Sequence, residues 1–159
     1  MFNFLKKTKN NDTFVSPVKG KMIQLSEVND PVFAEGMMGE GFGIIPADHS
    51  IYAPVEGDVT MSFPTGHAYG IQTQDGTEIL IHLGIDTVEL KGEGFEVFAK
   101  QGNHVKQGDL LCKMNLETIR ANGKEDTCIV LFPGGEQVEP LKVGKEMEAK
   151  EGNIVKYSK

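Results

Sequence analysis

Short apolar runs alternate with glycine-containing turns along most of the chain. The runs are rich in Val, Ile and Phe, and 19 glycines are spread between them. This spacing is typical of β-sandwiches and barrels. We therefore expect an all-β protein, an antiparallel β-sandwich or barrel-like sandwich with little helix. The expected strands are 13–15, 20–25, 41–46, 50–53, 57–63, 67–73, 77–83, 109–114, 128–132 and 154–157.

One segment has the signals of a short helix. Asn115 is a good N-cap residue, and Gly123 is a good residue to follow a helix C-terminus. We expect about two helical turns between them.

The most specific local pattern is an Asp75-Gly76 pair between two apolar runs that each carry a histidine. Asp-Gly favours a two-residue type I′ hairpin loop. That loop would place His82 opposite Tyr69 and make His67 its diagonal neighbour, about 7–8 Å away. A shift of one residue in register would put the two imidazoles on opposite faces. The residues expected on the shared face are Thr65, His67, Tyr69, Ile71, Leu80, His82 and Gly84, with Ile79, Ile81 and Leu83 facing the core.

Two neighbouring imidazoles suit three kinds of chemistry. They can bind a metal, with Asp86 as the nearest further ligand. They can act as acid and base, although no nucleophile or carboxylate pair accompanies them. One of them can be a nucleophile that carries a phosphoryl group while the other stabilises the charge. Thr65 could orient one ring, and the spacing alone does not choose between the three roles.

Composition narrows the class of protein. The chain has 159 residues and a net charge of −7, which fits one soluble domain and argues against binding nucleic acid. Cys112 and Cys128 have no metal-ligand spacing and are expected to be buried thiols. No apolar segment is long enough to cross a membrane, so a cytoplasmic location is expected. We expect a flexible tail over residues 1–12, in preference to a membrane-surface helix, and a single domain over residues 13–159.

The segment ILIHLGIDTVELKGEGF at 79–95 strongly resembles the glucose-type enzyme IIA family of the bacterial phosphoenolpyruvate-dependent sugar phosphotransferase system. The segments DPVFAE at 30–35, APVEG at 53–57 and FPTGHA at 63–68 match as well. The resemblance implies a β-sandwich with a shallow depression for the active site. It implies that His82 accepts a phosphoryl group from the phosphocarrier protein HPr. That group then passes to a cysteine of the enzyme IIB domain of a sugar permease.

The resemblance also implies roles for other residues. His67 matches a second histidine that supports transfer without being phosphorylated, and Thr65 matches its hydroxyl neighbour. No cofactor is required, although zinc is held by the histidine pair and a bound partner in some members. Regulatory partners are implied as an added role, and membrane contact only through the permease. The matching positions of the docking face are Asp30, Val32, Phe33, Met37, Met38, Phe63, Leu80, Asp86 and Val88.

Several alternatives accompany these expectations. Phe33, Met37 and Met38 could instead be core residues, and Asp30 and Asp86 could be turn residues. The segment 124–132 matches the family only loosely, because it lacks a proline near Cys128. A zinc hydrolase of the lysostaphin type is a rival, but it would need a later His-x-His strand, and only His104 follows. A purely regulatory binding protein on the same fold is the other rival.

Overall fold

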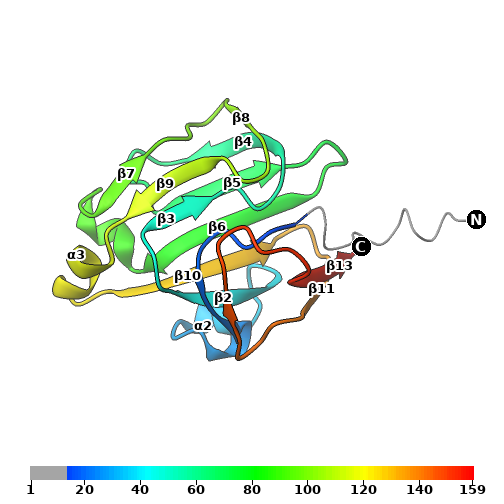
Figure 1. Ribbon diagram of the computed structural model, residues 1–159, viewed down its shortest axis with the longest axis horizontal. Coiled ribbons are helices and arrows are strands. Elements are labelled where there is room, and N and C mark those ends of the chain that lie inside the picture. The colour runs from blue at the N-terminus through cyan, green and yellow to red at the C-terminus, as the bar shows by residue number, and fades with distance from the viewer. Residues whose placement is uncertain (1–13) are drawn as a thin grey trace, which may run out of the picture.

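The computed structural model describes residues 14–159, which form layers of mainly antiparallel sheet (Figure 1). The large sheet has eight strands in the order β12-β1-β2-β10-β6-β5-β4-β8. A second sheet has the order β3-β9-β7, and β11 pairs with β13. The strands are β1 Gly20–Gln24, β2 Glu40–Pro46, β3 Ser50–Tyr52, β4 Gly57–Ser62, β5 Ala68–Gln72, β6 Glu78–Ile85, β7 Phe95–Val97, β8 His104–Val105, β9 Leu110–Met114, β10 Glu125–Phe132, β11 Gln137–Pro140, β12 Glu146–Met147 and β13 Val155–Ser158.

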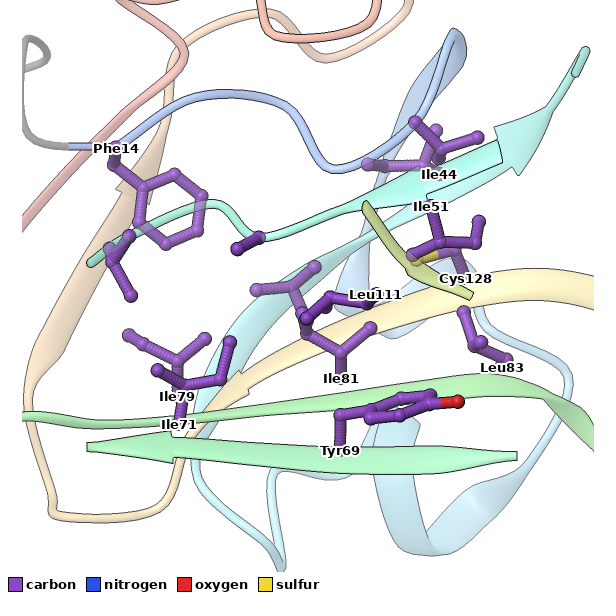
Figure 2. Close-up of a cluster of buried hydrophobic side chains, with 14 of the residues drawn as sticks. Phe14, Ile44, Ile51, Tyr69, Ile71, Ile79, Ile81, Leu83, Leu111 and Cys128 are labelled. Atoms are coloured by element: carbon purple, nitrogen blue, oxygen red, sulfur yellow. The ribbon is translucent and has the colours of Figure 1, made fainter. Parts of the chain in front are cut away.

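The main core lies between the large sheet and the β3-β9-β7 sheet. Figure 2 shows side chains of β5 and β6, among them Tyr69 and Ile81, on the same side as Ile51 of β3 and Leu111 of β9. All four are fully buried. The apolar face of each sheet is thereby removed from water, which supplies the main driving force for this arrangement. The all-β sandwich expected from the sequence is confirmed.

The helices are short and lie in the connections between strands. The helix α3 Leu116–Ala121 forms where it was expected, and the Asn115 side chain accepts a hydrogen bond from the Thr118 backbone N–H (3.0 Å). The sequence reading missed the one-turn helix α2 Pro31–Ala34 and the 3₁₀ turns Leu25–Glu27 and Thr87–Leu90. Within residues 14–159 no helix combines the length and apolar character needed to cross a membrane.

Most expected strands form within one or two residues of their expected limits. The exceptions are short or irregular. β7, β8, β11 and β12 were not expected, β10 is longer than expected, and residues 14 and 15 are not in a strand. Residue 13 and the expected tail 1–12 lie outside the described residues. Cys112 and Cys128 are both buried free thiols, as expected.

The register of the β5–β6 hairpin differs from the predicted one by a single residue. His82 lies opposite Ala68, and Tyr69 lies opposite Ile81. The loop has three residues, not two, because Thr73 pairs with Thr77. The Gly76 N–H donates to the Thr73 carbonyl (3.0 Å), and Gly76 has φ 91°. This is a turn followed by a glycine bulge, which Asp-Gly also suits.

The corrected register changes which residues share a face. Tyr69 and Ile71 point into the core with Ile79, Ile81 and Leu83, whereas the prediction placed them beside the histidines (Figure 2). His82 and Leu80 project from the opposite, outer face of the large sheet. The expectation that His67 shares this face because of strand alternation is therefore wrong, although its ring does lie beside that of His82.

Candidate functional site

His82 is held near the end of the central strand β6 by a bond from its own ring. Its Nδ1 lies 2.8 Å from the backbone oxygen of Gly84. A carbonyl oxygen only accepts, so Nδ1 must carry the proton that it donates. The neutral ring then has its lone pair on Nε2. The ring is partly exposed. Its hydrogen bond to the strand uses Nδ1, so Nε2 is left as the nucleophilic nitrogen.

His67 lies beside His82 because the chain bends just before β5. The Leu83 N–H donates to the His67 carbonyl (2.7 Å), which fixes the backbone across the hairpin. The Thr65 hydroxyl is 2.6 Å from His67 Nδ1. The two imidazole centroids are 5.5 Å apart with ring planes at 76°. The expected cluster of Thr65, His67 and His82 is therefore present in the structure, by a different route from the predicted one.

Burial keeps both imidazoles neutral near neutral pH. Desolvation lowers the pKa of His82, and the Gly84 carbonyl and the charges of Asp30 and Asp86 offset part of that shift. Desolvation also lowers the pKa of His67, and the neighbouring His82 lowers it further. Only the neutral imidazole has a free lone pair, so the site holds His82 in the form that can attack an electrophile.

The floor beside His82 is a small apolar cluster on the outer face of the large sheet. Ile129 of β10 lies directly opposite His82, and Leu131 lies opposite Leu80. Phe33 of α2 covers this cluster and is only 7% exposed, with its ring centroid 5.0 Å from that of His82. Phe33 is therefore a core residue of this small cluster and a wall of the site at the same time.

Exposed apolar side chains lie on the pair and in the segments next to it. Phe63 is 41% exposed and stacks on His67, with centroids 5.2 Å apart and ring planes at 10°. Val32 precedes Phe33 in α2, and Val88 follows the strand that carries His82. Exposed apolar groups around a polar centre are typical of a recognition surface. The large apolar side chains that stay exposed among residues 14–159 are Val32, Met37, Met38, Ile45, Phe63, Val88 and Phe98.

The two acidic residues expected at the docking face also serve local structure. The Asp30 side chain accepts a hydrogen bond from the Val32 N–H (2.9 Å) and caps α2. Asp86 is exposed and has a left-handed backbone with φ 60°. Desolvation lowers the pKa of His82, and the charges of both carboxylates oppose part of that lowering. The turn-forming and the electrostatic interpretations of these two residues are therefore compatible.

The donor set of this site does not suit a zinc ion held by this chain alone. In the part of the chain that the structure describes, no group of three or more His, Cys, Asp or Glu side chains could hold a metal. His67 and His82 supply two nitrogens, and Asp86 does not complete a set. His104 starts β8 opposite Asp58, at the far end of β4, where its ring bonds Asp58 and Glu56. The later histidine that a zinc hydrolase would need is therefore not at this site.

Sequence reasoning missed two residues beside His82. The Gly84 carbonyl selects the tautomer of His82, and the fully buried Thr87 lies against Gly84. A glycine near the end of the strand and an Asp-Thr pair directly after it indicate a break in regular structure, but they do not indicate where a carbonyl points. The direction of the Gly84 carbonyl depends on the backbone of Gly84, whose φ is 82°, and a sequence pattern does not give that angle.

The chain is similar to several known proteins. Residues 12–138 match the family model described as the phosphoenolpyruvate-dependent sugar phosphotransferase system, EIIA 1. The chain is 38% identical over 143 residues to the glucose-specific EIIA component of Staphylococcus epidermidis, covering 90% of this chain and 86% of that protein. It is 38% identical to the solved glucose permease IIA from Mycoplasma capricolum, with a TM-score of 0.87 over 96% of this chain and 97% of that one.

One of the relatives is much longer than this chain. The chain is 45% identical over 130 residues to the glucose-specific EIICBA component of Streptococcus pneumoniae, which covers 82% of this chain. It spans only 18% of that relative's length. The similarity therefore concerns one part of a much larger protein.

Proposed function

We propose that this chain, which belongs to the EIIA 1 family of the phosphoenolpyruvate-dependent sugar phosphotransferase system, is a phosphocarrier of sugar uptake and that His82 carries its phosphoryl group. The observation that carries this assignment is the bond from His82 Nδ1 to the Gly84 carbonyl. It leaves the Nε2 lone pair available on a neutral ring, beside a second imidazole on which the exposed Phe63 stacks.

The proposed donor is the phosphohistidine of the phosphocarrier protein HPr. The Nε2 lone pair of His82 attacks phosphorus, a new N–P bond forms, and the N–P bond of the donor breaks with its electron pair returning to the donor imidazole. A cysteine thiolate of an enzyme IIB domain then attacks the same phosphorus, and the His82 N–P bond breaks. The exposed residues Val32, Met37, Met38, Phe63 and Val88 are the proposed docking surface for both partners, together with the acidic Asp30 and Asp86.

His67 is proposed to hold the charge of the phosphoryl oxygens during transfer. In this proposal the Thr65 hydroxyl donates to Nδ1 of His67, so the neutral ring carries its proton on Nε2, from which it can donate to a phosphoryl oxygen. Stacking on Phe63 keeps the ring in place. Thr65 thus sets the tautomer of His67 with a donor, as Gly84 sets that of His82 with an acceptor.

Incubation with phosphoenolpyruvate, enzyme I and HPr tests the assignment. The wild-type chain should gain one acid-labile phosphoryl group, and His82→Ala should gain none. His49→Ala and His104→Ala are matched controls, because both rings are solvent-exposed and bond carboxylates away from the pair. A phosphoadduct that persists in His82→Ala would exclude His82 as the acceptor.

The role of His67 is tested by the second step. His67→Gln keeps the His82 nucleophile, so the phosphorylated form should still accumulate. Glutamine has amide N–H groups but loses the ring contacts with Thr65 and Phe63, so no donor is held in the place of His67 Nε2. Onward transfer to an enzyme IIB domain should therefore fall by about 10²–10³-fold, the usual effect of removing one donor to developing charge. Unchanged onward transfer would show that His67 has no such role. Domains from permeases for different sugars, compared in this assay, would identify the physiological acceptor.

A further inference from the structure

The carbonyl that holds His82 is in an unusual position for a strand. In regular β-structure side chains stand perpendicular to the sheet and carbonyls lie within it. The ring of one residue therefore does not reach the carbonyl two residues further on. Here the Gly84 backbone leaves the strand conformation with φ 82°, and pairing with β10 shifts from Leu83–Cys128 to Ile85–Glu125 at the same point. This local break is what brings the Gly84 oxygen to His82 Nδ1.

Thr87 holds this break in place from the buried side. Its side chain is fully buried, and its hydroxyl donates to the Leu83 carbonyl (2.6 Å). The Leu83 carbonyl and the Gly84 nitrogen belong to one peptide plane, so this bond restrains φ of Gly84. The Leu83 N–H already donates to the His67 carbonyl. Both backbone polar groups of Leu83, the residue that follows His82, are therefore hydrogen-bonded.

We infer that Thr87 is a positioning residue for His82: its hydroxyl, through the Leu83–Gly84 peptide, keeps the Gly84 carbonyl on Nδ1 and so keeps the lone pair on Nε2. The benefit of this arrangement for phosphoryl transfer rests on the proposed function. The tautomer itself does not, because it is a property of the unphosphorylated chain. A test on that chain therefore separates the two ideas.

The test is ¹⁵N NMR of the His82 side chain in the full-length unphosphorylated chain, which distinguishes an Nδ1–H imidazole from an Nε2–H one. Wild-type His82 should be almost entirely Nδ1–H. Thr87→Val keeps the shape and removes the hydroxyl. Weakening the Gly84 bond by the typical net value of one hydrogen bond should move the tautomer ratio about fivefold towards Nε2–H. Thr87→Ser, which restores the hydroxyl, should return the wild-type spectrum.

Ser16→Ala is the matched control for a general loss of stability. The Ser16 hydroxyl is also fully buried and donates to a backbone carbonyl, that of Val18 (2.7 Å). Its removal should lower stability without moving the His82 tautomer. If Thr87→Val does not fold, Thr87→Ala compared with Thr87→Ser gives the same contrast. A wild-type tautomer ratio in a folded hydroxyl-free variant would overturn the inference. So would a failure of both hydroxyl-free variants to fold while Thr87→Ser folds, because the hydroxyl would then serve the whole fold.

Discussion

Replacing Gly84 with alanine should be far more costly than replacing another left-handed glycine of the same hairpin. Gly84 and Gly76 have φ of 82° and 91°, so alanine is strained in both places. Their surroundings differ. A Cβ on Gly76 meets nothing within 4 Å, whereas one on Gly84 clashes with the methyl group of Thr87 and lies 2.7 Å from the Glu125 carbonyl oxygen.

The expected magnitudes follow from these two contributions. The left-handed conformation costs a residue with a Cβ about 1–2 kcal/mol, and this applies to both variants. Overpacking against a buried threonine and a backbone oxygen adds about 1–3 kcal/mol for Gly84→Ala only. The free energy of unfolding should therefore fall by about 1–2 kcal/mol in Gly76→Ala and by about 2–5 kcal/mol in Gly84→Ala.

Urea denaturation followed by circular dichroism measures both values under one condition. Because Gly76 is at the far end of the hairpin from the histidines, Gly76→Ala should also keep the wild-type rate of phosphorylation. Gly84→Ala should lose most of that rate, since the carbonyl that holds His82 must move. Equal destabilisation by the two substitutions would refute the steric reasoning, because only the shared backbone strain would then be acting.

Two further predictions use the burial of the site residues. The pKa values of His67 and His82 are lowered in the folded state, so near pH 6.5, the ordinary histidine pKa, the unfolded chain binds more protons and stability should fall as the pH drops through that value. In urea titrations between pH 7 and 5, the double variant His67→Gln/His82→Gln should show a weaker fall in stability. An unchanged fall would contradict the lowered pKa values. Phe33→Ala should lower stability by about 3–5 kcal/mol because it removes a buried ring. Phe63→Ala should change stability little in denaturation assays but weaken onward transfer of the phosphoryl group. A Phe63→Ala variant that loses stability and keeps the wild-type rate of transfer would exclude Phe63 as a docking residue.

Strand positions and the helix cap could be predicted because their signals are local. The alternation in 77–83 correctly gave Ile79, Ile81 and Leu83 as core residues, and Asn115 caps α3 as expected. Short strands such as β8 and β12 have two residues each and exist only because a neighbouring strand pairs with them. No alternation can be read over two residues, so the sequence carries no pattern for them.

The meeting of the two histidines needed more than strand alternation. In the observed register the position opposite His67 is Leu83, which is fully buried, so a regular strand would send both side chains into the core. The chain avoids this at Gly66, whose φ of 73° and close approach to Phe95 and Val97 turn it before β5 begins. The bend frees His67 from the pleat and lets its ring reach His82. The predicted register and the predicted regular strand were both wrong. Together they nevertheless placed the two imidazoles side by side, as the structure has them. The turn residues before His67, more than the Asp-Gly loop after it, therefore determine the geometry of the pair.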